Sequence, residues 1–288
     1  MERMSNKRLR VGFLPLAAVG SVLLLAFWLV SGVSADTVLF DSNGFEGYAP
    51  GPLQNQYNWL WTGSTLNTAT VQSGVVFSGT AAVAVSRVPN ADTFWGVQLS
   101  GSNGFTPTSQ QQISITWQQN PVFNPPSTSF GPYFGVEAYD AKVLGPTGGK
   151  AEFGSFGIDA TSQTFLLQNY DPDPALTGQI MDTGINANPG WNQMQMILDF
   201  STGQYSVYEN GNFLASQYFV DSPSGSLTTV TDVDIFATAA NGDAGSLAAT
   251  GTAYIDNLRV TVVPEPGTVT MLLAGLVSCL GLAWWRRR

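Results

Sequence analysis

The sequence contains no histidine and only one cysteine among its 288 residues. Without an imidazole, the chain cannot perform Ser-His-Asp or Cys-His catalysis, bind zinc through histidine, or use histidine as an acid or base. The single cysteine, Cys279, excludes an intramolecular disulfide, a cysteine-cluster zinc site and iron–sulfur ligation. Any chemistry must therefore use carboxylates, amides, hydroxyls and aromatic side chains.

Charged residues are also scarce, at 11% against about a quarter in typical soluble domains, whereas there are 31 glycines and 16 prolines. Most of the acidic residues are concentrated in one region. Residues 36–263 carry 18 carboxylates and only four basic residues, a net charge of −14. Such a field repels phosphate backbones and anionic lipids, which argues against nucleic acid as a partner. It suits divalent cations and neutral polymers.

The first 35 residues have the order of a secretory signal peptide. Four of the first ten residues are basic, the last of them Arg10, and the stretch from Val11 to Val30 carries no charge. Small residues then surround Val33 and Ala35, as they do at a cleavage site. We therefore expect cleavage before Asp36. Because 20 apolar residues would span about 30 Å as a helix, an uncleaved signal anchor is the alternative.

The C-terminal end holds a second apolar run, Thr268 to Trp285, which is followed by Arg286, Arg287 and Arg288. Under the positive-inside rule both basic ends face the cytoplasm, so the intervening residues lie on the far side of the membrane. A buried core helix is the alternative interpretation, but three terminal arginines are hard to bury. The run is predicted to be a transmembrane helix.

Pro264, Glu265 and Pro266 stand immediately before this helix. A Pro-Glu-Pro triplet, a short transmembrane helix and a terminal arginine cluster, in this order, resemble the PEP-CTERM sorting signal of exopolysaccharide-producing bacteria. The resemblance implies processing of residues 264–288 by exosortase, a membrane protease, after anchoring in the inner membrane. It also implies delivery of the preceding domain to the cell surface or extracellular matrix.

Residues 36–263 show repeated strand patterns bounded by Gly, Pro, Asn or Ser, and no convincing helical period. Alternation is clear in Gln112–Gln118, and we expect Tyr254, Asp256, Leu258 and Val260 to share one face of the last strand. The predicted strands are Thr37–Phe40, Ala81–Val88, Thr93–Leu99, Gln112–Gln118, Tyr133–Tyr139, Phe153–Ile158, Thr164–Gln168, Gln193–Phe200, Gln204–Glu209, Phe213–Phe219, Val230–Ala237 and Ala253–Val262.

About a dozen strands in 228 residues predict an all-β fold, an antiparallel two-sheet jelly-roll sandwich forming one domain, residues 36–263. Turns are expected at Ser201–Gly203 and at Asn210-Gly211, a strong hairpin signal. These hairpins, the closing strand 254–260 and the opening Phe45-Glu46-Gly47-Tyr48 resemble the concanavalin A-like (laminin G-like) jelly rolls. That fold serves lectins, glycosidases, lyases and plain spacers, so it does not define a function.

The resemblance to these jelly rolls implies a structural Ca²⁺ between the first and last strands. Asp41 and Glu46 follow the first strand, and Asp256 lies in the last, on the side expected to be apolar. A carboxylate there needs a partner, and a hard cation that takes six to eight oxygens would supply one. The alternative is that Asp256 accepts hydrogen bonds from loop amides.

Carbohydrate binding is the sharpest ligand hypothesis. Tyr57, Trp59 and Trp61 are spaced by two, so an extended backbone would present all three rings on one face, where they could stack on sugars. A role in the hydrophobic core is the alternative. Further aromatic candidates are Trp95, Tyr133, Phe134 and Trp191.

Catalysis would require carboxylates, since two carboxyl groups flanking the bond are the minimum for glycoside hydrolysis. Glu137 and Asp140 are three positions apart, which places them on opposite faces of a strand, and Glu152 and Asp159 stand at the two ends of another. The Glu-x-Asp-x-x-Glu signature of concanavalin A-like glycosidases is absent, so we predict no catalytic residue and no enzymatic activity. Asp232, Asp234 and Asp243 are interpreted as a solvated strand face and loop. The sequence thus favours a structural or carbohydrate-binding component of an exopolysaccharide matrix, with a carboxylate-dependent glycosidase or polysaccharide lyase as the alternative.

Overall fold

The structure is a computed structural model and describes residues 36–109, 111–125, 129–146, 148–170, 179–222 and 227–264. These residues belong to one compact unit. None of the helices found in these ranges is long and apolar enough to cross a membrane. The predicted signal peptide and the predicted sorting helix both lie outside the described residues.

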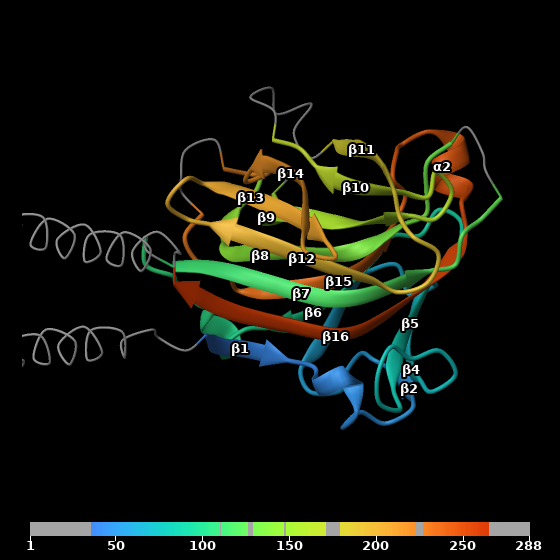
Figure 1. The fold of residues 1–288 in the computed structure, drawn as a ribbon, viewed down its shortest axis with the longest axis horizontal. Helices are drawn as coiled ribbons and strands as arrows, with labels where there is room; N and C mark the ends of the chain where they lie inside the picture. The colour runs from blue at the N-terminus through green and yellow to red at the C-terminus, as the bar shows by residue number, and fades with distance from the viewer. Residues whose placement is uncertain are drawn as a thin grey trace, which may run out of the picture. The chain divides into compact units, whose positions relative to one another are not determined.

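The described residues form two antiparallel sheets packed face to face, one of nine strands and one of seven (Figure 1). The strands of the nine-stranded sheet are β14 (Asn212–Tyr218), β13 (Gln204–Glu209), β12 (Asn192–Asp199), β7 (Gln111–Pro121), β16 (Gly251–Pro264), β5 (Ala82–Arg87), β4 (Thr68–Gln72) and β2 (Gly51–Pro52) in spatial order, with β1 (Thr37–Asp41) beside β16. The seven-stranded sheet runs β11 (Ile180–Asn186), β10 (Thr164–Gln168), β9 (Lys150–Asp159), β8 (Tyr133–Leu144), β15 (Asp232–Thr238), β6 (Thr93–Gln98) and β3 (Trp59–Gly63).

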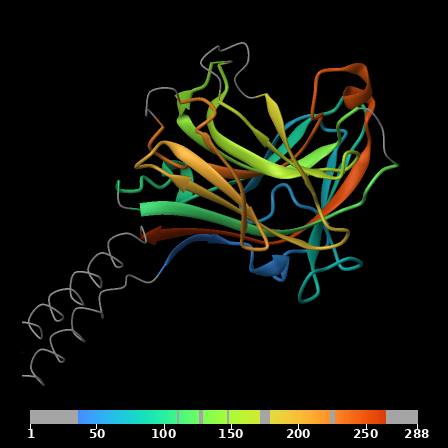
Figure 2. The same cartoon turned by 45° about the horizontal axis from the view of Figure 1, so that its top comes forward.

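The predicted two-sheet antiparallel sandwich is confirmed, and Figure 2 shows its two layers in a turned view. Every predicted strand is present, and the turns at 201–203 and 210–211 are where the sequence puts them. The sequence misses β2, β3, β4, β11 and the five-residue helix α2 (Ala244–Ala248). Of these, β2, β3 and β11 are edge strands, and edges need little hydrophobic patterning because one side of the strand is unpaired.

The last strand departs from simple alternation. The register of β16 with β7 shifts between Asp256 and Arg259, and Asn257 adopts a positive φ of 52°. Ile255 is fully buried before this bulge and Leu258 after it. The prediction that Tyr254 and Asp256 share a face with Leu258 is therefore wrong, because one extra residue in a bulge reverses the side on which later side chains point.

The two sheets differ in their outer faces. Strands β7 and β12 alternate between core residues and half-exposed polar residues, as a sheet with one solvated face does. Strands β8, β9 and β15 are buried on both faces over most of their length. Other residues therefore cover the outer face of these strands, and the candidate site lies on that face.

Candidate functional site

A groove of about 700 Å³ lies on the outer face of the seven-stranded sheet. Strands β8, β9, β10, β15 and β6 supply its floor, and the segment 238–247, which contains all but the last residue of α2, supplies one wall. The register of β8 with β15 divides the floor in two. Phe236 pairs with Gly135 in one half, and Asp234 pairs with Glu137 in the other.

One half of the groove is apolar. Tyr133, Phe236 and Leu166 form a small buried cluster, against which the half-buried Phe94 and Phe130 pack. The rings of Tyr133 and Phe236 meet edge to face with centroids 4.6 Å apart. The hydroxyl of Tyr133 donates to the carbonyl of Leu166 at 3.0 Å, so the ring is held at a fixed depth.

The other half is acidic. Glu137, Glu152 and Asp234 are at least nine-tenths buried. The Tyr139 hydroxyl donates to Glu137 Oε1 at 2.6 Å, but Glu152 Oε1 and Asp234 Oδ1 are buried without a hydrogen-bond partner. Asp234 lines an adjoining cavity of about 30 Å³, in which Lys150 pairs with Asp232.

Burial and mutual repulsion change the acidity of these groups. Burial raises the pKa of Glu137 well above its usual value, and the charges of Glu152 and Asp234 raise it further. The pKa of Glu152 is raised by burial and then by the charge of Asp221, and that of Asp234 by burial and then by Asp232. Each carboxyl is therefore biased toward its neutral form unless a cation approaches.

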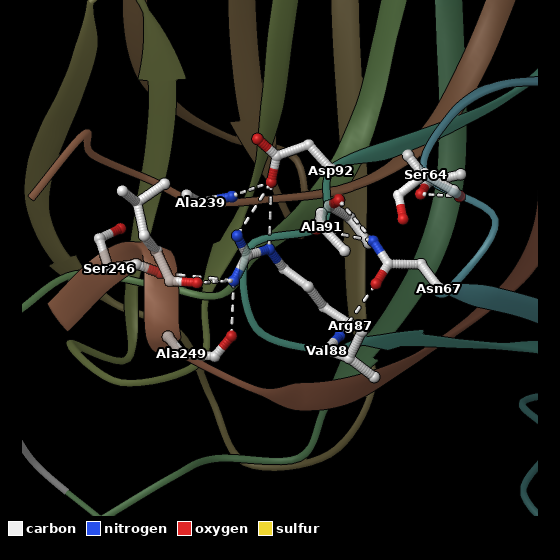
Figure 3. Close-up of polar contacts among 12 residues, drawn as sticks. Ser64, Asn67, Arg87, Val88, Ala91, Asp92, Ala239, Ser246 and Ala249 are labelled. Atoms are coloured by element: carbon white, nitrogen blue, oxygen red, sulfur yellow. Dashed lines mark hydrogen bonds and ion pairs between the residues drawn. The ribbon is translucent and has the colours of Figure 1, made fainter. Parts of the chain in front are cut away.

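A buried arginine, Arg87, holds one wall of the groove in place by hydrogen bonds (Figure 3). Arg87 on β5 is fully buried and donates to Asp92 Oδ1 from Nε at 3.2 Å and from Nη2 at 3.0 Å. Its Nη1 donates to three carbonyls at and just after α2, the shortest bond being to Ala249 at 2.5 Å. Asp92 Oδ1 also accepts the amide of Ala239 at 2.8 Å. The segment that closes the groove is thus tied to both sheets.

The structure separates the three predicted sugar-stacking aromatics. Trp59 is fully buried in the core and donates its indole N–H to the Tyr48 hydroxyl at 3.1 Å. Tyr57 precedes β3 in a turn with a positive φ of 46° and is 62% exposed, and Trp61 is 40% exposed. The predicted shared face is wrong because the strand begins only at Trp59. Of the further candidates, Tyr133 lines the groove, whereas Trp95 and Phe134 belong to the core.

The three predicted calcium ligands lie near one another but are used as hydrogen-bond acceptors. Asp256 Oδ2 accepts the amides of Phe77 and Ser78, and Glu46 Oε1 accepts those of Thr80 and Ala81. Asp41 accepts the amide of Asn43 and lies 3.5 Å from Arg259 Nε. No group of three or more acidic or cysteine side chains in the described residues is placed to hold a metal ion. These residues do not fit a calcium site, because N–H donors occupy the oxygens that a cation would need.

The predicted sorting motif begins where the fold ends. Pro264 is the last residue of β16 and pairs with Gln111 of β7. Glu265, Pro266, Arg286, Arg287 and Arg288 lie outside the described residues.

Reasoning from the sequence names Glu137 and Glu152 but considers each with a different carboxyl, so it misses that the two lie together in the acidic half of the groove. Asp232 and Asp234 are each only 3% exposed, so their interpretation as a solvated face is wrong. Alternation correctly places them opposite the core, but it does not reveal that residues of β3, β6 and β9, among them Lys150, enclose them on that face. A usable signal was the clustering of Gly96, Gly135 and Gly157 on these strands, since a Cβ at any of them would meet another residue within 2.3 Å.

Comparison with known proteins identifies the C-terminal segment and the fold. Residues 262–288 match the family model of the PEP-CTERM protein-sorting motif. The chain therefore carries a signal that implies an exported surface protein processed by exosortase. A search of the curated proteins finds no match.

Solved structures share the sandwich at low sequence identity. A carbohydrate esterase from the Shiga toxin-encoding bacteriophage phi24B aligns with a TM-score of 0.52 and 14% identity over 80% of this chain and 100% of that chain. An endo-beta-1,4-glucuronan lyase from the fungus Trichoderma reesei gives 0.49 and 13% over 78% of this chain and 95% of that one. A sialidase gives 0.47 and 10%, with 78% of this chain covering only 18% of its own length. The likeness to these structures is one of fold alone, an antiparallel β-sandwich, and the family match is to the C-terminal sorting motif.

Proposed function

We propose that this protein binds polysaccharide at the cell surface or in the extracellular matrix, and that the groove on the seven-stranded sheet is the binding site. The observation that carries the proposal is the groove itself, about 700 Å³ with aromatic rings in one half and polar groups in the other. Sugar rings present apolar C–H faces and hydroxyl edges, which need both kinds of surface. Ser155, Gln179 and Asn241 add uncharged hydrogen-bonding groups to the lining.

Binding of the full chain in detergent to a glycan array tests this proposal. Phe130→Ala should remove binding, since Phe130 is a half-buried aromatic ring of the groove. Tyr218→Ala is the matched control, because this ring is 54% exposed on β14 of the other sheet. A combined Tyr57→Ala and Trp61→Ala variant tests the sugar site predicted from the sequence. Loss of binding in that variant alone would move the site away from the groove, and no binding to any glycan would favour a purely structural role.

A carboxylate-dependent glycosidase is the second candidate function. It is favoured by the different surroundings of Glu137, which accepts the Tyr139 hydroxyl, and Glu152, whose Oε1 has no partner. Unequal environments are what assign one carboxyl as acid and another as base. Release of reducing sugar by the full chain, abolished in Glu152→Gln, would support hydrolysis.

The groove is less suited to a lyase. Burial raises the pKa of Tyr133 and of Tyr139 well above the usual value, so neither phenol is prepared to act as a base. No lysine or arginine is found among the groove-lining residues that the structure describes, and such a residue would neutralise the carboxylate of a uronic acid. We therefore expect no unsaturated ends to form from uronate polymers.

A further inference from the structure

The groove carries acidic groups without matching cations. Asp92, Glu137, Glu152 and Asp182 line it. Asp92 has Arg87 as its ion-pair partner, but the described residues contain no ion pair to the other three. Lys150 on β9, whose charge lowers the pKa of Glu137, forms its ion pair with Asp232. The groove thus has an excess of acidic groups, which a bound cation would hold in their charged form, in a domain that is already strongly acidic.

Glu152 shows where in the groove the excess of acidic groups could meet a ligand. Its side chain belongs to a residue only 7% exposed, and it still lines the groove. The side chain of Gln168 hydrogen-bonds to the carboxyl group, but the atom Oε1 has no hydrogen-bond partner among the described residues. A buried carboxylate oxygen without a donor is costly, so such an atom facing a groove indicates a donor that the ligand supplies.

We propose that the ligand is a polysaccharide with free amino groups, and that its ammonium group binds between Glu152 and Glu137. This inference rests on the glycan-binding function proposed above and narrows it to a substrate class. An ammonium group has three donors and no acceptor, which complements a site with acceptors and few donors. A hydroxyl or an N-acetyl group brings no charge, and a uronate brings the wrong one.

The division of the groove supports the same ligand. The Tyr139 residue pairs across the sheet with Glu152, and its ring already lies 5.5 Å from the ammonium group of Lys150, so this part of the floor tolerates a cation over an aromatic face. The apolar half, with Phe94 and Phe130, lies beside it and can pack against the C–H face of a sugar ring. An amino sugar presents both surfaces on one unit.

Three matched oligosaccharides test the inference by calorimetric titration of the full chain in detergent. They are a glucosamine hexasaccharide, its N-acetylated form with the same linkages, and the corresponding glucose hexasaccharide. We expect the glucosamine oligomer to bind at least about tenfold more tightly than the other two, in the range of one hydrogen bond to a charged group. Its affinity should fall as salt is added.

Two variants locate the effect. Glu152→Gln keeps the shape but removes the charge, and it should weaken glucosamine binding by about tenfold or more while leaving the weaker glucose binding unchanged. Asp199→Asn removes one charge from a turn on the nine-stranded sheet and should leave all three affinities unchanged. Equal weakening by both variants would indicate a general effect of net charge and would overturn the inference.

The outcomes separate this inference from the proposed function. Equal binding of the three oligosaccharides, or tighter binding of a neutral glycan, would overturn the amino-sugar ligand and leave the groove as a glycan site. Binding of a lysine hexapeptide as tight as that of the glucosamine oligomer would overturn it as well, because the site would then recognise only positive charge. Failure to bind any glycan, on the array or in titration, would remove the proposed function itself.

Discussion

The outer faces of the two sheets differ in solvent exposure and in the charge that they bury. On the nine-stranded sheet, Gln118, Gln193 and Gln195 belong to a half-exposed surface of amides and hydroxyls. On the seven-stranded sheet, the corresponding face is covered and buries carboxylates whose charges repel one another. The first face is stable because water solvates it. The second exists at a cost in stability, which is the usual sign of a surface retained for binding or chemistry.

The largest difference in stability between the two faces should appear when the hydrogen bonds of Arg87 to the groove wall are removed. Arg87→Met leaves three carbonyls and Asp92 without their donor, and we expect the free energy of unfolding to fall by about 2–4 kcal/mol in urea denaturation. Arg259→Met is the matched control at the nine-stranded sheet, where the arginine is half exposed and 3.5 Å from Asp41. Its loss should be below about 0.5 kcal/mol. Similar losses in the two variants would show that burial of Arg87 contributes nothing.

A smaller effect of opposite sign is expected from Glu137→Gln. The folded-state pKa of Glu137 is raised by burial, so the folded chain keeps a proton that the unfolded chain releases. The stability from this group is complete below the unfolded pKa and is lost as pH rises through the folded pKa. The amide should therefore raise the free energy of unfolding by about 1 kcal/mol at neutral pH, with no gain in acid, as thermal unfolding across pH would show.

The matched control on the other face is Asp199→Asn. Burial opposes the shift, but hydrogen bonds from Ser201 and Thr202 lower the pKa of Asp199. Stability from this group is present above its unfolded pKa and is lost as pH falls, so its amide should be slightly destabilising at neutral pH. If Glu137→Gln and Asp199→Asn shift the free energy of unfolding in the same direction, the two faces do not differ in their electrostatics in this way.

The smallest effect should come from removing divalent cations. Amide donors already occupy Asp256 Oδ2 and Glu46 Oε1 on the nine-stranded side, so a chelator should leave the melting temperature of the full chain within about one degree. Calcium should not raise it. A drop of several degrees would mean that these loops rearrange around an ion and that the sequence-based calcium prediction holds after all.

How well the sequence predicts the burial of a residue depends on which face of which sheet the residue lies on. Core positions such as Ile113, Ile115 and Trp117 are correct because their neighbours are solvated, and alternation then reads burial directly. The same rule fails at Asp234, since a strand pattern reports which side a residue faces and not what covers that side. At Tyr57 it fails because a spacing of two residues does not show where the strand begins, and Tyr57 lies in a turn before β3. The PEP-CTERM motif was predicted in full because it depends on the order of residues and not on packing.

The position of the closing strand has a mechanical consequence. β16 is hydrogen-bonded to β7 over most of its length, to β5 near its start, and to β1 from Arg259 to Val262 (Figure 1). A pull applied at Pro264 along the strand axis loads these ladders in shear, so many hydrogen bonds must break at once and not one after another. The strand that leads to the sorting segment is thus held in a way that resists tension.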